Sequence, residues 1–204
     1  MDIQTPRLIL TPIVASDTDG IHSIRGRKEV MKWSLRGLPE TPAETAQWVS
    51  NVLSSPAPWI CFAVRERASP SGSIVGSVGV RYIHDRLSPD ADDFKRWEMG
   101  YIFHPDWWGK GYATESVQGV VEGWNGLGGI RETTIARWKE GNGAQAEVAA
   151  EAEGEDVEHA AIWAITNADN EGSQGVLKKS GFDCVGSFVD VYGKGCMTYK
   201  ILIG

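Results

Sequence analysis

The chain has 204 residues, of which 42% are hydrophobic, and a formal net charge of −7. This length and apolar content suffice for one sizeable core, so we expect a single domain over residues 1–204. The excess of acids argues against a nucleic-acid partner, because binding to a phosphate backbone needs basic patches.

The sequence lacks the signatures of several other protein classes. No stretch reaches the roughly 18 consecutive apolar residues of a membrane span. Met1-Asp2-Ile3-Gln4 lacks the basic and then apolar start of a secretory signal. The three cysteines have no CxxC spacing, which favours reduced thiols, and the four histidines are scattered. We therefore expect a cytoplasmic protein with no membrane partner and no metal site.

The first half of the chain predicts strands and one well-marked helix. Residues 6–13 show a strand pattern, and residues 17–32 show short helical pieces. Thr41-Pro42-Ala43-Glu44 predicts a helix start, with an N-cap, a proline at the first helical position and a capping-box acid. Two strand patterns at 59–64 and 73–80 flank a Ser/Pro/Gly turn and predict a hairpin.

The second half alternates strands with helices. A strand pattern over 97–103 leads through a glycine-containing loop into a helix, and strand 161–166 is followed by a helix around 173–180. Two strand patterns, 182–191 and 196–202, complete the chain. This order predicts a three-layer α+β fold, with a mixed, mostly antiparallel central sheet of about six to seven strands and helices on both faces.

The acidic charge is concentrated in one segment. Residues 139–158 hold seven acids against Lys139 and carry −6, so the rest of the chain carries only −1. An Ala/Glu/Gly-rich segment of this kind is typical of a solvated loop or a short exposed helix. The second interpretation is that this acidic segment attracts cationic amines electrostatically. We expect an insertion at about residues 131–160.

The loop after strand 97–103 is the clearest functional signal. Trp108-Gly109-Lys110-Gly111-Tyr112-Ala113-Thr114 opens a helix, and such a loop leaves backbone N–H groups free for a phosphate or pyrophosphate. On spacing alone, a plain tight turn is the alternative. Four charge-assisted bonds would contribute roughly 6–12 kcal/mol against an association cost of ~4–15 kcal/mol. The loop would therefore orient a ligand without holding it alone.

Two further motifs stand in order around this loop. Thr5-Pro6-Arg7-Leu8-Ile9-Leu10 lies near the start, and residues Asn167 to Ser173 lead into a helix that ends in Gly181-Phe182. Together the three motifs resemble the GCN5-related N-acetyltransferases (GNAT superfamily), in its RimJ/RimL-like branch. In that family, Arg/Gln-x-x-Gly-x-Gly/Ala binds the pyrophosphate of acetyl-coenzyme A. Here Trp108, Gly111 and Ala113 take the three defining places, with a tryptophan where the family has Arg or Gln.

The resemblance implies acetyl-coenzyme A as the cosubstrate, with its pantetheine arm along strand 97–103 where this strand splays from strand 161–166. The residues thereby assigned to it are Tyr101, Ile102, Phe103, Trp108, Gly109, Lys110, Gly111, Tyr112, Ala113, Thr114, Asn167, Asn170 and Ser173. Helix capping is the alternative role for Asn170, and turn formation is the alternative for Asn167.

Glu98 is the candidate general base. Strand alternation places Glu98, Gly100 and Ile102 on one face and Met99, Tyr101 and Phe103 on the other. A carboxylate in an apolar strand is costly unless it is paired, hydrated or functional, so the alternative is an ion pair, for instance with Arg81. The branch often carries an acid here that contacts the amine.

Ser173 is the candidate proton donor to the leaving thiolate. The family often uses a tyrosine on this helix, but none occurs between Asn167 and Phe182, so the resemblance assigns this role to Ser173.

We therefore predict an acyltransferase, an acetyl-coenzyme A-dependent N-acetyltransferase that acts without a metal and releases coenzyme A. The acceptor would be a primary amine of a small molecule, an amino acid or a peptide N-terminus, and Trp33 could line its pocket. The alternatives are a non-catalytic acyl-coenzyme A-binding module and a ribosomal-type protein N-terminal acetyltransferase. We expect a monomer or a homodimer.

Overall fold

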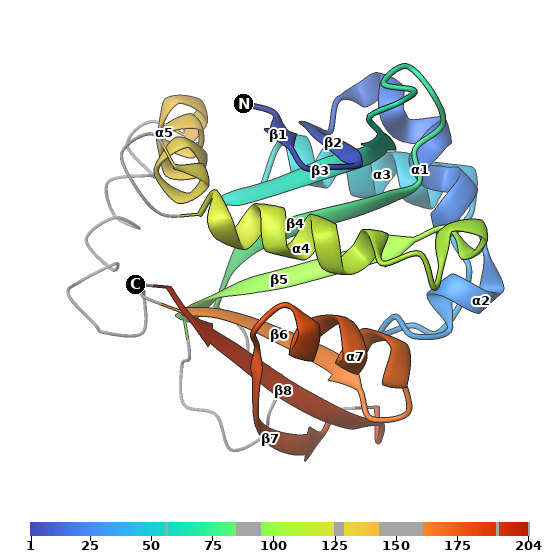
Figure 1. Ribbon diagram of the computed structural model, residues 1–204, viewed down its shortest axis with the longest axis vertical. Coiled ribbons are helices and arrows are strands. Elements are labelled where there is room, and N and C mark those ends of the chain that lie inside the picture. The colour runs from blue at the N-terminus through green and yellow to red at the C-terminus, as the bar shows by residue number, and fades with distance from the viewer. Residues whose placement is uncertain (56, 85–94, 125–128, 143–160, 191, 204) are drawn as a thin grey trace.

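A mixed β-sheet organises the protein (Figure 1). The computed structural model describes residues 1–55, 57–84, 95–124, 129–142, 161–190 and 192–203. In these residues eight strands form one sheet, in the order β1-β2-β3-β4-β5-β6-β8-β7. They are β1 (Ile3–Gln4), β2 (Leu8–Pro12), β3 (Trp59–Glu66), β4 (Gly76–His84), β5 (Lys95–Phe103), β6 (Ala161–Asn167), β7 (Asp183–Val189) and β8 (Gly195–Leu202).

The predicted fold class is confirmed, with one strand more than expected. All neighbouring strands are antiparallel except β5 and β6, which are parallel. The additional strand is β1, whose two residues are too few to show an alternating pattern in the sequence.

Helices cover both faces of the sheet, as the sequence predicted. The helices are α1 (Thr18–Arg25), α2 (Lys28–Met31), α3 (Pro42–Leu53), α4 (Tyr112–Glu122), α5 (Ile130–Asn142) and α7 (Glu171–Lys179). Two buried clusters fill the spaces between the layers. One joins the sheet to α4, α5 and α7 through Val117, Val120, Ile130 and Leu177. The other joins it to α1, α2 and α3 through Ile21, Ile24, Met31, Val49 and Val52.

The parallel strands β5 and β6 separate after two residue pairs. Trp97 pairs with Ile162 and Glu98 with Trp163, and no later pair joins these two strands. Each strand is fully paired on its other side, β5 with β4 and β6 with β8. The expected splay is therefore present, and α4 and α7 follow the carboxyl ends of the two diverging strands.

The expected insertion begins with a packed helix. Ile130, Thr134 and Trp138 are buried at intervals of four residues, so one face of α5 lies against the core. Residues 131–138 of the expected insertion therefore belong to a packed helix, while Lys139 and Glu140, at the start of the acidic segment, are exposed in its last turns. The remainder, residues 143–160, lies outside the described residues.

The three cysteines lie on strands and are free thiols. Cys61 on β3 and Cys196 on β8 are buried, and Cys184 on β7 is exposed. Burial raises the pKa of the Cys61 thiol to about 12, so this thiol is not a nucleophile at neutral pH. Within the described ranges, no helix has the length and apolar content needed to cross a membrane.

The capping box predicted at the start of α3 is present. The Glu44 N–H donates to Thr41 Oγ1 at 3.3 Å, and the Thr41 N–H donates to Glu44 Oε2 at 2.8 Å. Arg36 Nη1 also donates to Glu44 Oε1. These bonds, led by the one from the Thr41 backbone, lower the pKa of Glu44 from 4.5 to about 2.

This lowered pKa predicts a pH-dependent contribution to stability. A depressed carboxyl pKa stabilises the fold fully above pH 4.5, and the contribution is lost as the pH falls towards 2. We expect the melting temperature of wild type to exceed that of Glu44→Gln at pH 6 and the gap to shrink at acid pH. Thermal unfolding monitored by circular dichroism measures both. Glu122→Gln, at an exposed position of α4, is the control, and a pH-independent gap would contradict the assignment.

Candidate active site

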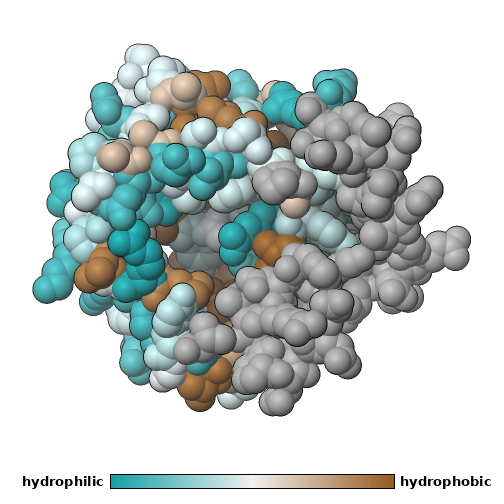
Figure 2. All heavy atoms as spheres, turned by 180° about the vertical axis from the view of Figure 1, so that it is seen from behind, coloured by the Kyte–Doolittle hydropathy of each residue, from teal (hydrophilic) through white to brown (hydrophobic). Residues whose placement is uncertain are grey.

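A pocket lies in the gap between β5 and β6. It has a volume of about 380 Å³ and is lined by β3, β4, β5, β6, the start of α7, the region of α2 and the β7–β8 turn. The molecular face in Figure 2, seen from behind the view of Figure 1, is hollowed near its centre. In sheets with parallel strands, ligands bind beyond the carboxyl ends of the strands, at a point where neighbouring strands separate. This pocket lies at such a point, so it is the candidate active site.

The structure brings part of the predicted set together in this pocket. The lining residues among the predicted ones are Glu98, Tyr101, Ile102, Asn167, Asn170 and Ser173. Phe103 is not one of them, because its ring is buried in the core and its carbonyl accepts a hydrogen bond from Trp108 Nε1 at 2.7 Å. The segment from Trp108 to Thr114 also lies outside the pocket lining, in the loop and first turn that follow β5.

That loop has the backbone geometry expected of an anion site. Gly109 and Gly111 have φ values of +74° and +78°, which favour glycine over other residues. Within the described part of the chain, no hydrogen bond uses the backbone N–H of Gly109, Lys110 or Gly111. The first N–H groups of α4 also lack intrahelical acceptors. The loop thus fits a phosphate group by its main chain, and space is open around Gly109.

An arginine from the N-terminal motif supports this loop. Arg7 Nη1 donates to the Lys110 carbonyl at 2.9 Å, and Arg7 Nε donates to Glu115 Oε2 at 2.6 Å. Thr5 Oγ1 donates to the same carboxylate. Burial alone would raise the pKa of Glu115, but the bonds from Thr5 and Arg7 outweigh it and lower the pKa. Arg7 therefore both positions the loop and neutralises an acid that would otherwise repel a phosphate.

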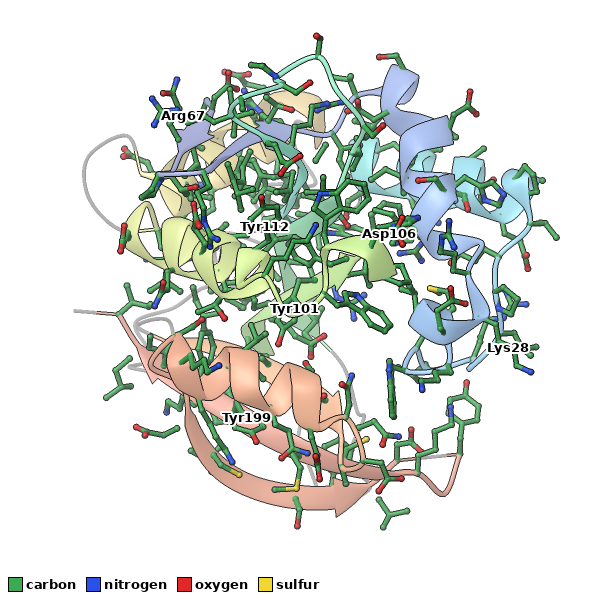
Figure 3. The ribbon with its side chains drawn as sticks, turned by 45° about the vertical axis from the view of Figure 1, so that its right-hand side comes forward. Lys28, Arg67, Tyr101, Asp106, Tyr112 and Tyr199 are labelled. Atoms are coloured by element: carbon green, nitrogen blue, oxygen red, sulfur yellow. The ribbon has the colours of Figure 1, made fainter. Side chains whose placement is uncertain are left out.

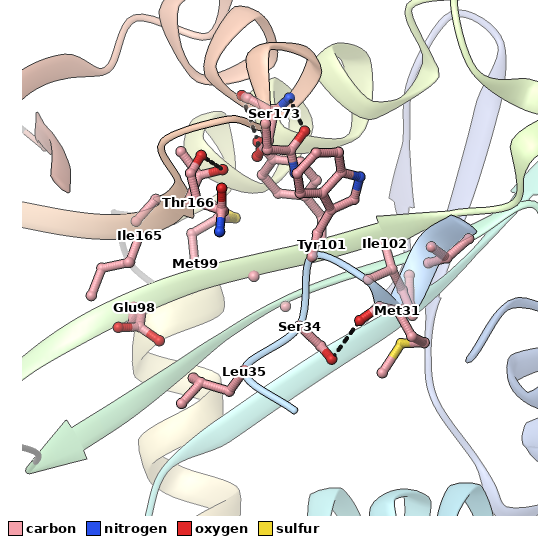
Figure 4. A pocket seen from close by; sticks show the side chains of 18 of the residues that line it. Met31, Ser34, Leu35, Glu98, Met99, Tyr101, Ile102, Ile165, Thr166 and Ser173 are labelled. Carbon is pink, nitrogen blue, oxygen red and sulfur yellow. Dashed lines mark hydrogen bonds between the residues drawn. The ribbon is translucent and has the colours of Figure 1, made fainter. Parts of the chain in front are cut away.

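Glu98 is held by two arginines. Its Oε1 accepts from Arg81 Nη2 at 3.1 Å, and its Oε2 accepts from Arg96 Nη2 at 3.2 Å. The carboxylate side chain is 12% exposed and faces the pocket (Figure 4). The ion pair with Arg81, which the sequence left open, is therefore present, and Arg96 adds a second one. Both contacts are compatible with a carboxylate that also meets a ligand.

A hydroxyl pair lies on the other side of β5. The Tyr101 hydroxyl is 2.8 Å from Ser173 Oγ and 3.0 Å from the Ser173 carbonyl, so the strand is tied to the first turn of α7 (Figures 3 and 4). Burial raises the pKa of Tyr101, while the bond to Ser173 partly lowers it. The phenol thus stays protonated and can donate. The family resemblance assigns Tyr101 to the cosubstrate. It does not indicate the contact with Ser173, which lies 72 positions away in the chain.

Asn167 and Asn170 hold the turn between β6 and α7. Asn167 Oδ1 accepts from the Asp169 N–H at 2.8 Å, and Asn170 Oδ1 accepts from the Ser173 N–H at 3.1 Å. The turn-forming and capping alternatives are therefore realised. Both residues also line the pocket, and their amide nitrogens are available to a ligand.

No metal site is visible in the residues that the structure describes, where no three His, Cys, Asp or Glu side chains come together in a suitable arrangement.

The pocket, the loop and the diverging strands agree with a match to a known protein family. Residues 7–183 match the family described as acetyltransferase (GNAT) domain. The chain belongs to the GNAT acetyltransferases. The superfamily inferred from the three motifs is thereby confirmed, and the match extends across α5.

Solved structures share this GNAT fold over nearly the whole chain. A GNAT-family acetyltransferase from Bacillus anthracis is 20% identical, with a TM-score of 0.66 and coverage of 99% of this chain and 98% of that one. RimL, a ribosomal L7/L12 α-N-protein acetyltransferase in complex with coenzyme A, is 12% identical, with a TM-score of 0.64 and coverage of 100% and 98%. The aminoglycoside acetyltransferase AAC(6')-Ib with coenzyme A is 14% identical, with a TM-score of 0.61 and coverage of 96% and 94%. At these identities the likeness shows the fold.

The loop geometry predicts that a side chain at Gly111 weakens binding of coenzyme A. Left-handed backbone costs a non-glycine residue about 1–2 kcal/mol, and the new Cβ would lie 3.4 Å from Arg7 Nη2. We expect Gly111→Ala to raise the dissociation constant of coenzyme A about tenfold, measured by calorimetry. Gly186→Ala, on β7 in open space, is the matched control. An unchanged dissociation constant for Gly111→Ala would remove the loop from the binding site.

Proposed function

We propose that this GNAT protein transfers the acetyl group of acetyl-coenzyme A directly to a primary amine. The observation that carries the proposal is the placement of two reactive groups on opposite faces of β5, next to the gap. Glu98 lies on one face, and the hydroxyl pair of Tyr101 and Ser173 lies on the other. An amine and a thioester that meet in the gap would lie between an anion and a proton donor.

Three features support the binding of acetyl-coenzyme A. The free N–H groups of the loop 109–111 suit its pyrophosphate, and Arg7 keeps Glu115 neutralised beside them. Among the described residues, the edge of β5 beyond Glu98 has no strand partner on the β6 side, which leaves its main-chain groups for the amides of the pantetheine arm. Two of the three solved structures compared above contain coenzyme A.

The chemistry follows from these positions. Glu98 attracts the ammonium group and takes its proton through a water molecule, and the neutral amine then attacks the thioester carbon. A carbon–nitrogen bond forms and the carbon–sulfur bond breaks. After the attack the nitrogen releases its second proton to water. In the arrangement in which Ser173 Oγ accepts from Tyr101, the Ser173 hydroxyl passes its proton to the departing sulfur and recovers one from water, and the products are an acetamide and coenzyme A. The free N–H groups at the edge of β5 are the donors available to the carbonyl oxygen during this step.

Glu98→Gln tests the role of the base and separates the enzyme from a non-catalytic acyl-coenzyme A-binding module. The substitution keeps the shape and removes the charge, so we expect turnover to fall at least tenfold while coenzyme A affinity stays within about twofold. Thiol release and calorimetry measure the two quantities, and Glu122→Gln is the control. Unchanged turnover would remove Glu98 from the mechanism. Wild-type protein that binds acetyl-coenzyme A but acetylates no amine would identify a binding module.

Tyr101→Phe tests the role of the hydroxyl pair. The ring remains in the core while the bond to Ser173 Oγ is lost, so we expect kcat to fall about tenfold or more with the KM for acetyl-coenzyme A nearly unchanged. Ser173→Ala should lower kcat by at least as much, and the double variant should be no slower than Ser173→Ala. Tyr192→Phe, at an exposed position, is the control. Additive losses in the double variant would show that the two hydroxyls act separately.

A further inference from the structure

The acceptor side of the pocket has a row of three side chains across the sheet. Trp59 on β3 is the register partner of Arg81 on β4, and Arg81 is the register partner of Glu98 on β5. Residues directly opposite each other on neighbouring strands project to the same face. All three line the pocket, so an aromatic ring, a cation and an anion stand side by side along one wall.

Arg81 has hydrogen-bonding capacity to spare. Of its five N–H donors, one bonds to Glu98 Oε1, and no other hydrogen bond of this side chain occurs within the described ranges. Its guanidinium carbon lies 5.9 Å from the centre of the Trp59 ring, and the side chain is 42% exposed. A carboxylate entering the pocket would therefore find a guanidinium with free donors, the partner that planar carboxylates prefer.

Three tryptophans, Trp33, Trp48 and Trp59, line the pocket, and cationic side chains of the protein already lie over two of them. The Arg25 guanidinium carbon lies 4.1 Å from the centre of the Trp48 ring, and Lys32 Nζ lies 4.4 Å from that of Trp33. Trp48 and Trp59 meet edge to face at 5.9 Å. Trp33 lines the pocket, as the sequence suggested, but Lys32 already lies over its ring, so we do not expect the cationic group of the acceptor there. The rings instead offer half-buried apolar surface to an uncharged side chain.

The described lining of the pocket offers few acids to an acceptor with several amines. Within the described lining, the acids are Glu98 and Asp190. Glu98 is shared by two arginines, and Asp190 Oδ1 accepts from the backbone N–H groups of Tyr192 and Lys194. Three cations, Arg25, Arg81 and Lys194, line the same space. Arg25 is itself paired with Glu40, so Arg81 and Lys194 are the cations that an acceptor with several amines would meet, with Glu98 as the acid open to one of its amines.

Lys194 ties two walls of this pocket together. Its Nζ donates to the carbonyls of Ser34 and Leu35 at 3.3 and 2.9 Å, which connects the β7–β8 turn to the segment after α2. Both carbonyl residues line the pocket (Figure 4). This link bounds the acceptor side and favours a small acceptor over a folded protein chain.

From these observations we propose that the acceptor is a free α-amino acid with an apolar, preferably aromatic, side chain. Its ammonium group faces Glu98, its carboxylate binds Arg81, and its side chain packs against Trp48 and Trp59. The ammonium and carboxylate groups of an amino acid are both attached to the same carbon atom. Glu98 and Arg81 present the complementary charges side by side, with Arg81 Nη2 3.1 Å from Glu98 Oε1. A peptide N-terminus has an amide in place of the carboxylate and would leave Arg81 without that partner. This inference rests on the proposed N-acetyl transfer.

Thiol release with a matched acceptor series tests the proposal. The series is L-phenylalanine, L-phenylalaninamide, 2-phenylethylamine, L-alanine, a short peptide with N-terminal phenylalanine, and kanamycin. With the purified full chain and acetyl-coenzyme A, we expect the kcat/KM of L-phenylalanine to exceed that of each other acceptor at least tenfold. Arg81→Gln should lower kcat/KM for L-phenylalanine at least tenfold, mainly through KM, and change it less than threefold for L-phenylalaninamide.

The amide separates binding of the carboxylate from any effect of Arg81 on its neighbour Glu98. Arg27→Gln is the matched control, because Arg27 has the same 42% exposure and lies outside the pocket lining. Equal or better turnover of the amide, the peptide, 2-phenylethylamine or kanamycin would overturn the acceptor class and leave N-acetyl transfer intact. An equal loss for phenylalanine and its amide in Arg81→Gln would overturn the role of Arg81. Binding of acetyl-coenzyme A without acetylation of any amine would overturn the proposed function itself.

Discussion

The separation of β5 from β6 is the constraint on which the rest of the structure depends. Each strand is fully hydrogen-bonded on its outer side, β5 to β4 and β6 to β8, while only two residue pairs join them to each other. The gap exposes main-chain groups of β5, brings the start of α7 beside Tyr101 and places the loop before α4 at the same end of the sheet.

A second constraint is charge compensation by arginine. Glu115 lies in the first turn of α4, and Glu98 lies on a strand beside the pocket. Arg7 neutralises Glu115, so the positive end of the helix dipole stays available to a phosphate. Arg81 and Arg96 neutralise Glu98 in the same way, but they also compete with a bound ligand for its carboxylate. The net charge of −7 therefore says little about the pocket, whose described lining carries more cations than acids.

Much of the fold and part of the site could be predicted from local sequence. The capping box at Thr41, the glycine loop at 109–111 and the alternation along 97–103 are set by a few neighbouring residues, and the structure contains all three. The family resemblance assigns Phe103 to the cosubstrate, and the structure shows that its carbonyl bonds to Trp108 and that its ring is buried in the core. The buried face of α5 was missed because the acidic composition of the following segment outweighed the spacing of Ile130, Thr134 and Trp138.

The sequence by itself determined the α+β class and the glycine conformations of the loop before α4, because these depend on spacing and backbone chemistry among neighbouring residues. It also singled out Glu98 from its place in the strand, and the family resemblance added Ser173. Only the tertiary structure decided which side chains work together. Tyr101 meets Ser173 across 72 positions, and Arg7 meets Glu115 across 108. Arg81 meets both Trp59 and Glu98 through strand register. Such contacts depend on how strands pair and helices dock, and local patterns in the chain do not record that.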